Sequence, residues 1–134
     1  MAGYSGTPLQ KKLGIKPGDS LLIQHAPIEY LDWVSPLPEG VSVKRSSTKD
    51  LDFIHSFVTD QKEFKKLFVS NKKVLKKDGM MWISWPKKSS GVQTDLDENF
   101  IRDFGLKAGL VDVKVCAVDE TWSGLKFVYR VKDR

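Results

Sequence analysis

SLLIQHA, residues 20–26, is a short apolar run that stands between a Pro-Gly turn and Pro27. Such a run is typical of a β-strand that is covered on both faces, as the strands of a parallel sheet are. Two more runs of this kind follow, LDFIHSFV at 51–58 and MMWISW at 80–85. VSVKR at 41–45, between the first two runs, alternates apolar and polar residues and predicts a half-buried strand.

Helical patterns separate these strands. A short helix is expected over 7–14, capped by Thr7, and one or two helical turns begin at Pro27. From Asp60 the period changes to that of an amphipathic helix, which we expect to end at Asp78–Gly79. Its apolar face carries Phe64, Leu67, Phe68 and Leu75, and its polar face carries Lys62, Lys65, Lys66, Lys72, Lys73 and Lys76.

The last third of the chain predicts one more helix and two strands. Thr94 or Asp95 is expected to cap the helix, and the strands cover 110–118 and 125–131. The link between the strands, DETWSG at 119–124, is short enough for an antiparallel pair. Strands that alternate with helices argue for a three-layer α/β sandwich. We therefore predict a sheet of about six strands, mainly parallel, with an antiparallel C-terminal strand.

Size and composition restrict the class of protein. The chain has 134 residues and a mass of 15.2 kDa, which suits a single domain over 1–134. Its longest apolar run is far below the roughly 20 residues of a membrane-spanning helix, and its start lacks a signal-peptide pattern. We expect no membrane association and a cytoplasmic location. The single cysteine, Cys116, lies in an apolar alternation and predicts a buried thiol.

The positive charge is unevenly distributed along the chain. Of the formal charge of +5, residues 60–91 carry +6, residues 1–59 carry 0 and residues 92–134 carry −1. Such a concentration attracts nucleic acid, phosphate or an acidic protein surface. A solvated lysine-rich helix face gives the same count, and we favour that interpretation here.

The order of elements resembles that of the class I methyltransferases, which use S-adenosylmethionine and have a Rossmann-like fold ending in an antiparallel strand. LKKDGMMWISWPK at 75–87 is similar to their fifth strand and the helix end before it. The chain also resembles an uncharacterised bacterial family, a domain of unknown function, through GYSGTPL (3–9), SWPKK (84–88) and GLVDVKVCAVDETWSGLKFV (109–128). The methyltransferase resemblance implies that the last strand inserts between the strands predicted at 80–85 and 110–118.

Two features of the methyltransferase site are missing from the sequence. Enzymes of that fold follow the first strand with glycines, because a backbone without Cβ lets the cofactor approach closely. Residues 24–30 read QHAPIEY and hold no glycine. Such enzymes also place an acid after the second strand to bind ribose hydroxyls, whereas this chain has KRSS at 44–47. The sequence therefore predicts that no cofactor is bound.

Candidate binding residues follow the carboxyl ends of the parallel strands, where ligands of such sheets bind. SWPKKSSGVQTD at 84–95 has the residue types of a phosphate site, but not the order of a P-loop, and acids in the next helix oppose an anion. We expect neither a catalytic nor a metal site, and we expect His55, Trp82 and Trp85 to be core residues. The predicted ligand or partner site consists of His25, Lys87, Lys88, Ser89, Thr94 and Trp122.

These observations favour a noncatalytic Rossmann-like binding module that meets a small anion or a protein partner, so enzymatic activity is not expected. The alternative is a small methyltransferase-like enzyme that binds S-adenosylmethionine in an unusual pose. A third possibility is weak nucleic-acid binding through the lysine-rich helix. That possibility ranks last because the aromatic rings needed for base stacking fall in predicted buried strands.

Overall fold

The computed structural model describes residues 7–46 and 48–134. Gly3 to Gly6, part of one phrase that carries the family resemblance, lie outside these described residues. The helices are α1 (Leu9–Leu13), α2 (Tyr30–Trp33), α3 (Gln61–Val74) and α4 (Glu98–Lys107), with single 3₁₀ turns at Lys88–Ser90 and Val131–Asp133. The strands are β1 (Ser20–Gln24), β2 (Ser42–Lys44), β3 (Leu51–Phe57), β4 (Leu75–Pro86), β5 (Leu110–Ala117) and β6 (Trp122–Tyr129).

The six strands form one mixed sheet in the order β2-β1-β3-β4-β6-β5. The first four strands of that order are parallel to one another, and β6 is antiparallel to both β4 and β5. The last strand thus lies between β4 and β5, as the methyltransferase resemblance implied. The predicted Rossmann-like fold class is confirmed.

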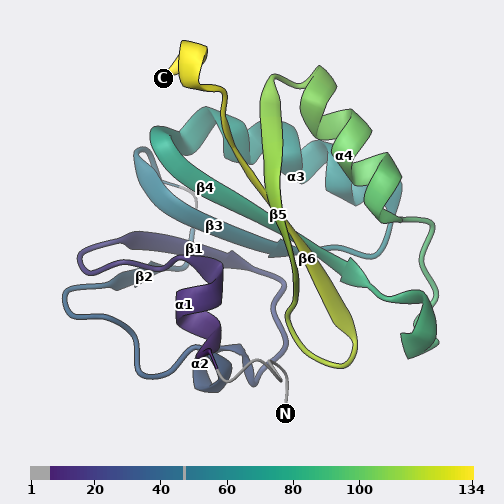
Figure 1. Ribbon diagram of the computed structural model, residues 1–134, viewed down its shortest axis with the longest axis horizontal. Coiled ribbons are helices and arrows are strands. Elements are labelled where there is room, and N and C mark those ends of the chain that lie inside the picture. Colours follow the sequence, from purple (N-terminus) through teal and green to yellow (C-terminus); the bar gives the residue numbers. More distant parts are fainter. Residues whose placement is uncertain (1–6, 47) are drawn as a thin grey trace.

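Helices cover both faces of the sheet (Figure 1). Residues of α3 and α4 pack on one face, and residues of α1 and α2 pack on the other. The period of a strand sends alternate side chains to opposite faces, and Trp82 joins the α1–α2 side while Trp85 joins the α3–α4 side. Both tryptophans are buried, as predicted. Among the helices of the described chain, none has the length and apolar character needed to cross a membrane.

The boundary between α3 and β4 differs from the prediction. The helix ends at Val74, and Leu75 enters the core as the first residue of a 12-residue strand. The strand register shifts between Leu75, which pairs with Leu51, and Met80, which pairs with Phe53. Residues 76–79 therefore form a bulge in the strand, so Asp78–Gly79 does not end a helix.

Three other predicted boundaries also shift. Pro8, not Thr7, occupies the cap position of α1. Asp97, not Thr94 or Asp95, caps α4, and its side chain accepts a hydrogen bond from the N–H of Phe100 at 2.8 Å. β6 begins at Trp122, inside the predicted link, because the Asp119 carboxylate accepts the N–H groups of residues 121 and 122 and tightens the turn.

Gly105 provides a test of the packing between α4 and the sheet. A Cβ at this position would lie 2.1 Å from Cε1 of Phe127. We expect Gly105→Ala to lower the free energy of unfolding by about 1–3 kcal/mol, because overpacking displaces a buried ring. Urea denaturation measures the change. Asp103→Ala, at an exposed position of the same helix, is the control and should stay within about 0.5 kcal/mol of the wild type. Equal stability of all three proteins would contradict the packing described here.

Candidate ligand site at the carboxyl edge of the sheet

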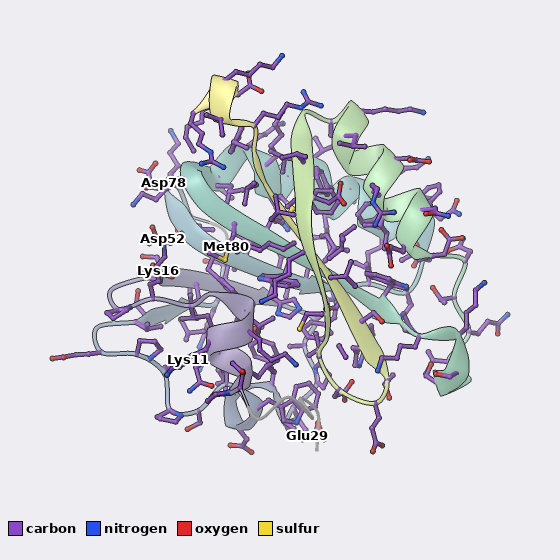
Figure 2. The ribbon with its side chains drawn as sticks, viewed as in Figure 1. Lys11, Lys16, Glu29, Asp52, Asp78 and Met80 are labelled. Atoms are coloured by element: carbon purple, nitrogen blue, oxygen red, sulfur yellow. The ribbon has the colours of Figure 1, made fainter. Side chains whose placement is uncertain are left out.

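The carboxyl ends of β1, β3 and β4 lie on the same side of the sheet, and their arrowheads point toward the right of the view in Figure 1. We call this rim the carboxyl edge; it comprises 24–27, 59–60 and 85–88. Asp52 and Asp78, labelled in Figure 2, lie at the opposite end of the strands. Ligands of open α/β sheets bind beyond the carboxyl ends of the strands, so the carboxyl edge is the candidate site.

The turn after β1 contains a strained residue. His25 has φ of 60°, in the left-handed region that residues other than glycine rarely adopt. Such a conformation costs on the order of 1–3 kcal/mol and persists only where neighbouring structure enforces it. It also ends β1 at Gln24, two residues before the predicted end of the strand. The His25 side chain is exposed, and Ala26 after it is half-buried.

Tyr30 fastens this turn to the sheet. Its hydroxyl lies 2.8 Å from Nδ1 of His55, and Nε2 of His55 lies 2.7 Å from the Ser84 hydroxyl oxygen. A neutral imidazole has one donor and one acceptor nitrogen, so it serves both hydroxyl groups at once. The three side chains come from α2, β3 and β4, and His55 and Ser84 have no exposed surface. His55 is therefore a satisfied core histidine, as the sequence predicted.

Burial determines the protonation of this hydrogen-bonded chain. Desolvation lowers the pKa of His55 to about 3, and it raises the pKa of Tyr30 above its ordinary value. The imidazole is thus neutral at physiological pH. Although a serine hydroxyl next to an imidazole is the arrangement of an activated nucleophile, no substrate reaches a hydroxyl with zero exposure. Burial likewise raises the pKa of the Cys116 thiol and leaves it a core residue.

A second polar cluster lies on the other face of the sheet, under α3. The Gln24 side-chain oxygen accepts hydrogen bonds from the Ser56 hydroxyl and from Nδ2 of Asn71, the latter at 2.8 Å. Asn71 also donates to the Ser56 hydroxyl oxygen at 3.0 Å. This cluster holds the end of β1 against β3 and α3. The sequence patterns did not predict this polar cluster. Asn71 nevertheless follows Phe64 and Phe68 at helical spacing, so it lies on the apolar face of the helix.

Two hollows open near the carboxyl edge. The first, of about 430 Å³, lies between the end of β4 and the start of α4, and the second, of about 390 Å³, lies at the end of β3. The first is lined by Trp85, Lys87, Lys88, Leu96, Asp97, Glu98, Asn99 and Ser123, and the second by Thr59, Asp60, Gln93, Thr94 and Asp95.

The structure does not bring the six predicted site residues into one pocket. Lys87 and Lys88 line the first hollow, whereas Thr94 lines the second and donates its hydroxyl to the carbonyl of Thr59. His25 stands on the turn after β1, and Ser89 is exposed on the 3₁₀ turn after β4. The Trp122 ring packs edge-on against Phe57, with ring centres 5.1 Å apart, and so covers the protein's own sheet.

In comparisons with known proteins, no protein-family model and no curated protein matches the sequence. Solved structures do match. A SAM-dependent methyltransferase from Aquifex aeolicus is 16% identical, with 87% of this chain and 85% of that chain covered and a TM-score of 0.60. The fold is shared with SAM-dependent methyltransferases.

Two other solved structures lead to the same result. A putative type 11 methyltransferase from Sulfolobus solfataricus is 14% identical, with 84% of this chain and 85% of that chain covered and a TM-score of 0.57. A ribosomal protein L11 methylase from Lactobacillus delbrueckii subsp. bulgaricus is 10% identical, with 91% and 75% covered and a TM-score of 0.56. These matches overturn the prediction of a noncatalytic binding module; what they show of its alternative, a methyltransferase-like enzyme, is the shared fold.

The buried histidine predicts a pH dependence of stability. The unfolded chain takes up a proton at His55 near the ordinary pKa of 6.5, and the folded chain does so only near 3. Unfolding therefore gains a proton between these values, and stability falls as the pH drops through that window, by up to about 1.4 kcal/mol per pH unit. Urea denaturation of the wild type and His55→Gln at a series of pH values measures this contribution.

We expect His55→Gln to lose that part of the slope, because glutamine bonds both hydroxyl groups without titrating. His25→Gln, at the exposed histidine, is the matched control and should keep the wild-type slope. A slope that is the same in all three proteins would contradict the buried, neutral state of His55.

Proposed function

We propose that this chain is a methyltransferase-like enzyme that binds S-adenosylmethionine at the carboxyl edge. The observation that carries the proposal is the left-handed turn at His25, directly after the first strand of a sheet with the methyltransferase strand order. A strained backbone that neighbouring contacts enforce is more often found at ligand sites than elsewhere. The hydrogen bonds of Gln24 before the turn and of Tyr30 after it hold the backbone in this conformation.

The turn fits the main-chain requirement of an adenosyl ligand. The function of glycine after the first strand is to permit a tight turn and a close approach of the main chain. Here His25 adopts the left-handed conformation, and its side chain is exposed to solvent. The half-buried side chain of this turn is that of Ala26, which is only a methyl group. When bound, the cofactor would supply an electrophilic methyl group carried on a sulfonium.

The position that binds the cofactor's ribose in related folds does not hold a suitable residue in this chain. β2 ends at Lys44 and is followed by Arg45, so the carboxylate that binds ribose hydroxyls in related folds is not at that position. Two carboxylates instead line the hollow at the end of β3, Asp60 of the carboxyl edge and Asp95 beside it. Each also accepts a backbone N–H, Asp60 from Glu63 and Asp95 from Gln61. We propose that Asp60 and Asp95, near the end of β3, bind the sugar hydroxyls in place of a residue after β2. The cofactor would then bind in a pose that differs from that in related folds.

The hollow beside β4 is the proposed site of the methyl acceptor. It combines Lys87 and Lys88 with Asp97 and Glu98, so it presents both signs of charge to a small molecule. The acids oppose a simple anion there, which agrees with the sequence argument against a phosphate cradle. A small anion or a protein partner at these lysines stays a prediction.

We also propose membership of the uncharacterised bacterial family, and with it a cytoplasmic role. The phrases that support it are SWPKK at 84–88, at the end of β4, and 109–128, which spans most of the β5–β6 hairpin. Both segments border the hollow beside β4, where Lys87 donates its side-chain N–H to the carbonyl of Asp119 at 2.7 Å. The two sequence segments therefore form one side of the proposed methyl-acceptor site.

Calorimetric titration with S-adenosylmethionine and its demethylated product tests the proposal. We expect micromolar binding of both compounds by the wild type. Ala26→Leu should weaken binding at least about tenfold, because a larger side chain fills the space against the main chain. His25→Gly should retain binding, since glycine adopts the same backbone conformation.

Ala108→Leu, at the C-terminal end of α4, is the matched control for added bulk. Thermal melting of each variant checks that it is folded. An absence of heat with both compounds, or an equal loss in Ala26→Leu and Ala108→Leu, would refute the proposed site.

A further inference from the structure

Lysines of α3, together with Lys77 of β4, line two hollows that share a lining residue. Two hollows lie along this helix, one of about 620 Å³ and one of about 480 Å³, and Val69 lines both. Lys62, Lys65 and Lys66 line the first, and Lys72, Lys73 and Lys77 line the second. We call these six lysines and Val69 the lysine trough.

The trough is strongly positive because little opposes its charge. The three ion pairs of the described residues use Lys76 and Arg102, so none of them neutralises a trough lysine. Asp95 is the single acid among the residues that line the two hollows. Glu63 is the acidic residue of α3 itself. Uncompensated like charges in a concave surface raise the local concentration of anions.

Several trough lysines are held in place on rings or carbonyl groups. Lys72 donates to the carbonyl of Ala108 at 2.6 Å, and Lys77 lies over the Tyr129 ring, 4.3 Å from its centre. Lys65 lies 5.5 Å from the centre of the Phe100 ring. These contacts lower the entropy that the side chains lose on binding a ligand. They also restrict the positions of these three ammonium groups.

We propose that the lysine trough binds the phosphate backbone of a nucleic acid. The positive face from Lys62 to Lys73 is about 16 Å long, at the helical rise of 1.5 Å per residue, and about 16 Å of one nucleic-acid strand carries about five phosphate charges. Protein interfaces are depleted in lysine, so an acidic protein fits this face less well. Lysine contacts phosphate as a compact point charge, and phosphate contacts carry no direct sequence information, which predicts little sequence preference.

This inference does not rest on the proposed methyltransferase activity. The sequence argument against nucleic acid concerned base stacking on Trp82 and Trp85, both of which are buried. Contact with the phosphate backbone needs no stacked ring. The trough starts beside Gln61 and Asp95, and Asp95 also lines the hollow at the end of β3, so a strand bound along α3 would run to the carboxyl edge.

Fluorescence anisotropy with labelled single-stranded RNA of about 20 nucleotides tests the proposal, with titrations over a range of salt concentrations from about 50 mM. We expect the logarithm of the binding constant to fall linearly with the logarithm of salt concentration, with a slope of about −3 or steeper. The triple variant Lys62→Gln, Lys66→Gln, Lys73→Gln should reduce the slope by about 2 and lower affinity at least about tenfold at low salt.

The matched control removes the same charge elsewhere, through Lys11→Gln, Lys16→Gln and Lys49→Gln. Figure 2 shows Lys11 and Lys16 on the α1 side of the molecule, away from α3. We expect this control to keep most of the wild-type slope. An absence of binding at low salt, equal losses in the two triple variants, or equally tight binding of poly-glutamate would each overturn the proposal. Titration with S-adenosylmethionine is a separate measurement, so failure of one proposal does not decide the other.

Discussion

The imidazole of His55 is the constraint on which the candidate site depends. It is the one group that joins α2, β3 and β4 through side-chain hydrogen bonds among the residues described, with Tyr30 on one nitrogen and Ser84 on the other. α2 is a single turn of helix, and its Tyr30 and Trp33 pack on the core on the α1–α2 side of the sheet. The hydrogen bond to His55 adds a directional contact to that packing and fixes the position of the Tyr30 ring. A buried polar chain that is fully satisfied specifies a unique arrangement better than apolar contacts do.

The turn at the end of β1 shows how a backbone conformation can persist when the usual residue is absent. Glycine adopts a left-handed conformation at little cost, whereas His25 requires compensation from its neighbours. Gln24 is bonded to β3 and α3 on one face of the sheet, and Tyr30 is bonded to β3 on the other. The fold thus fixes the path of the main chain by holding both flanks of the turn. A left-handed turn after β1 therefore forms in this chain without a glycine.

The sequence predicted the alternation of strands and helices and the burial of Trp82 and Trp85, because strand and helix periods are local properties. The place of the last strand between β4 and β5 came from the methyltransferase resemblance. It did not predict the bulge before Met80, since that bulge depends on pairing with β3, which is distant in the sequence. The site residues were grouped by their positions at strand ends, yet Trp122 turned toward the sheet and packed on Phe57. Side-chain direction in turns depends on tertiary packing, which local patterns do not contain.

The two edge strands of the sheet, β2 and β5, affect how readily folded molecules pair with one another through their strands. β2 is only three residues long and is followed by Arg45, so it offers a foreign strand few backbone groups and a charged flank. β5 is longer, but an extra residue, Val113, interrupts its regular pairing between Asp112 and Lys114 and bends the strand. Short, charged or bent margins are poor templates for intermolecular β-pairing. β2 therefore gives little opportunity for growth into fibrils at its edge of the sheet, and at the other edge the bulge at Val113 interrupts the pairing surface of β5.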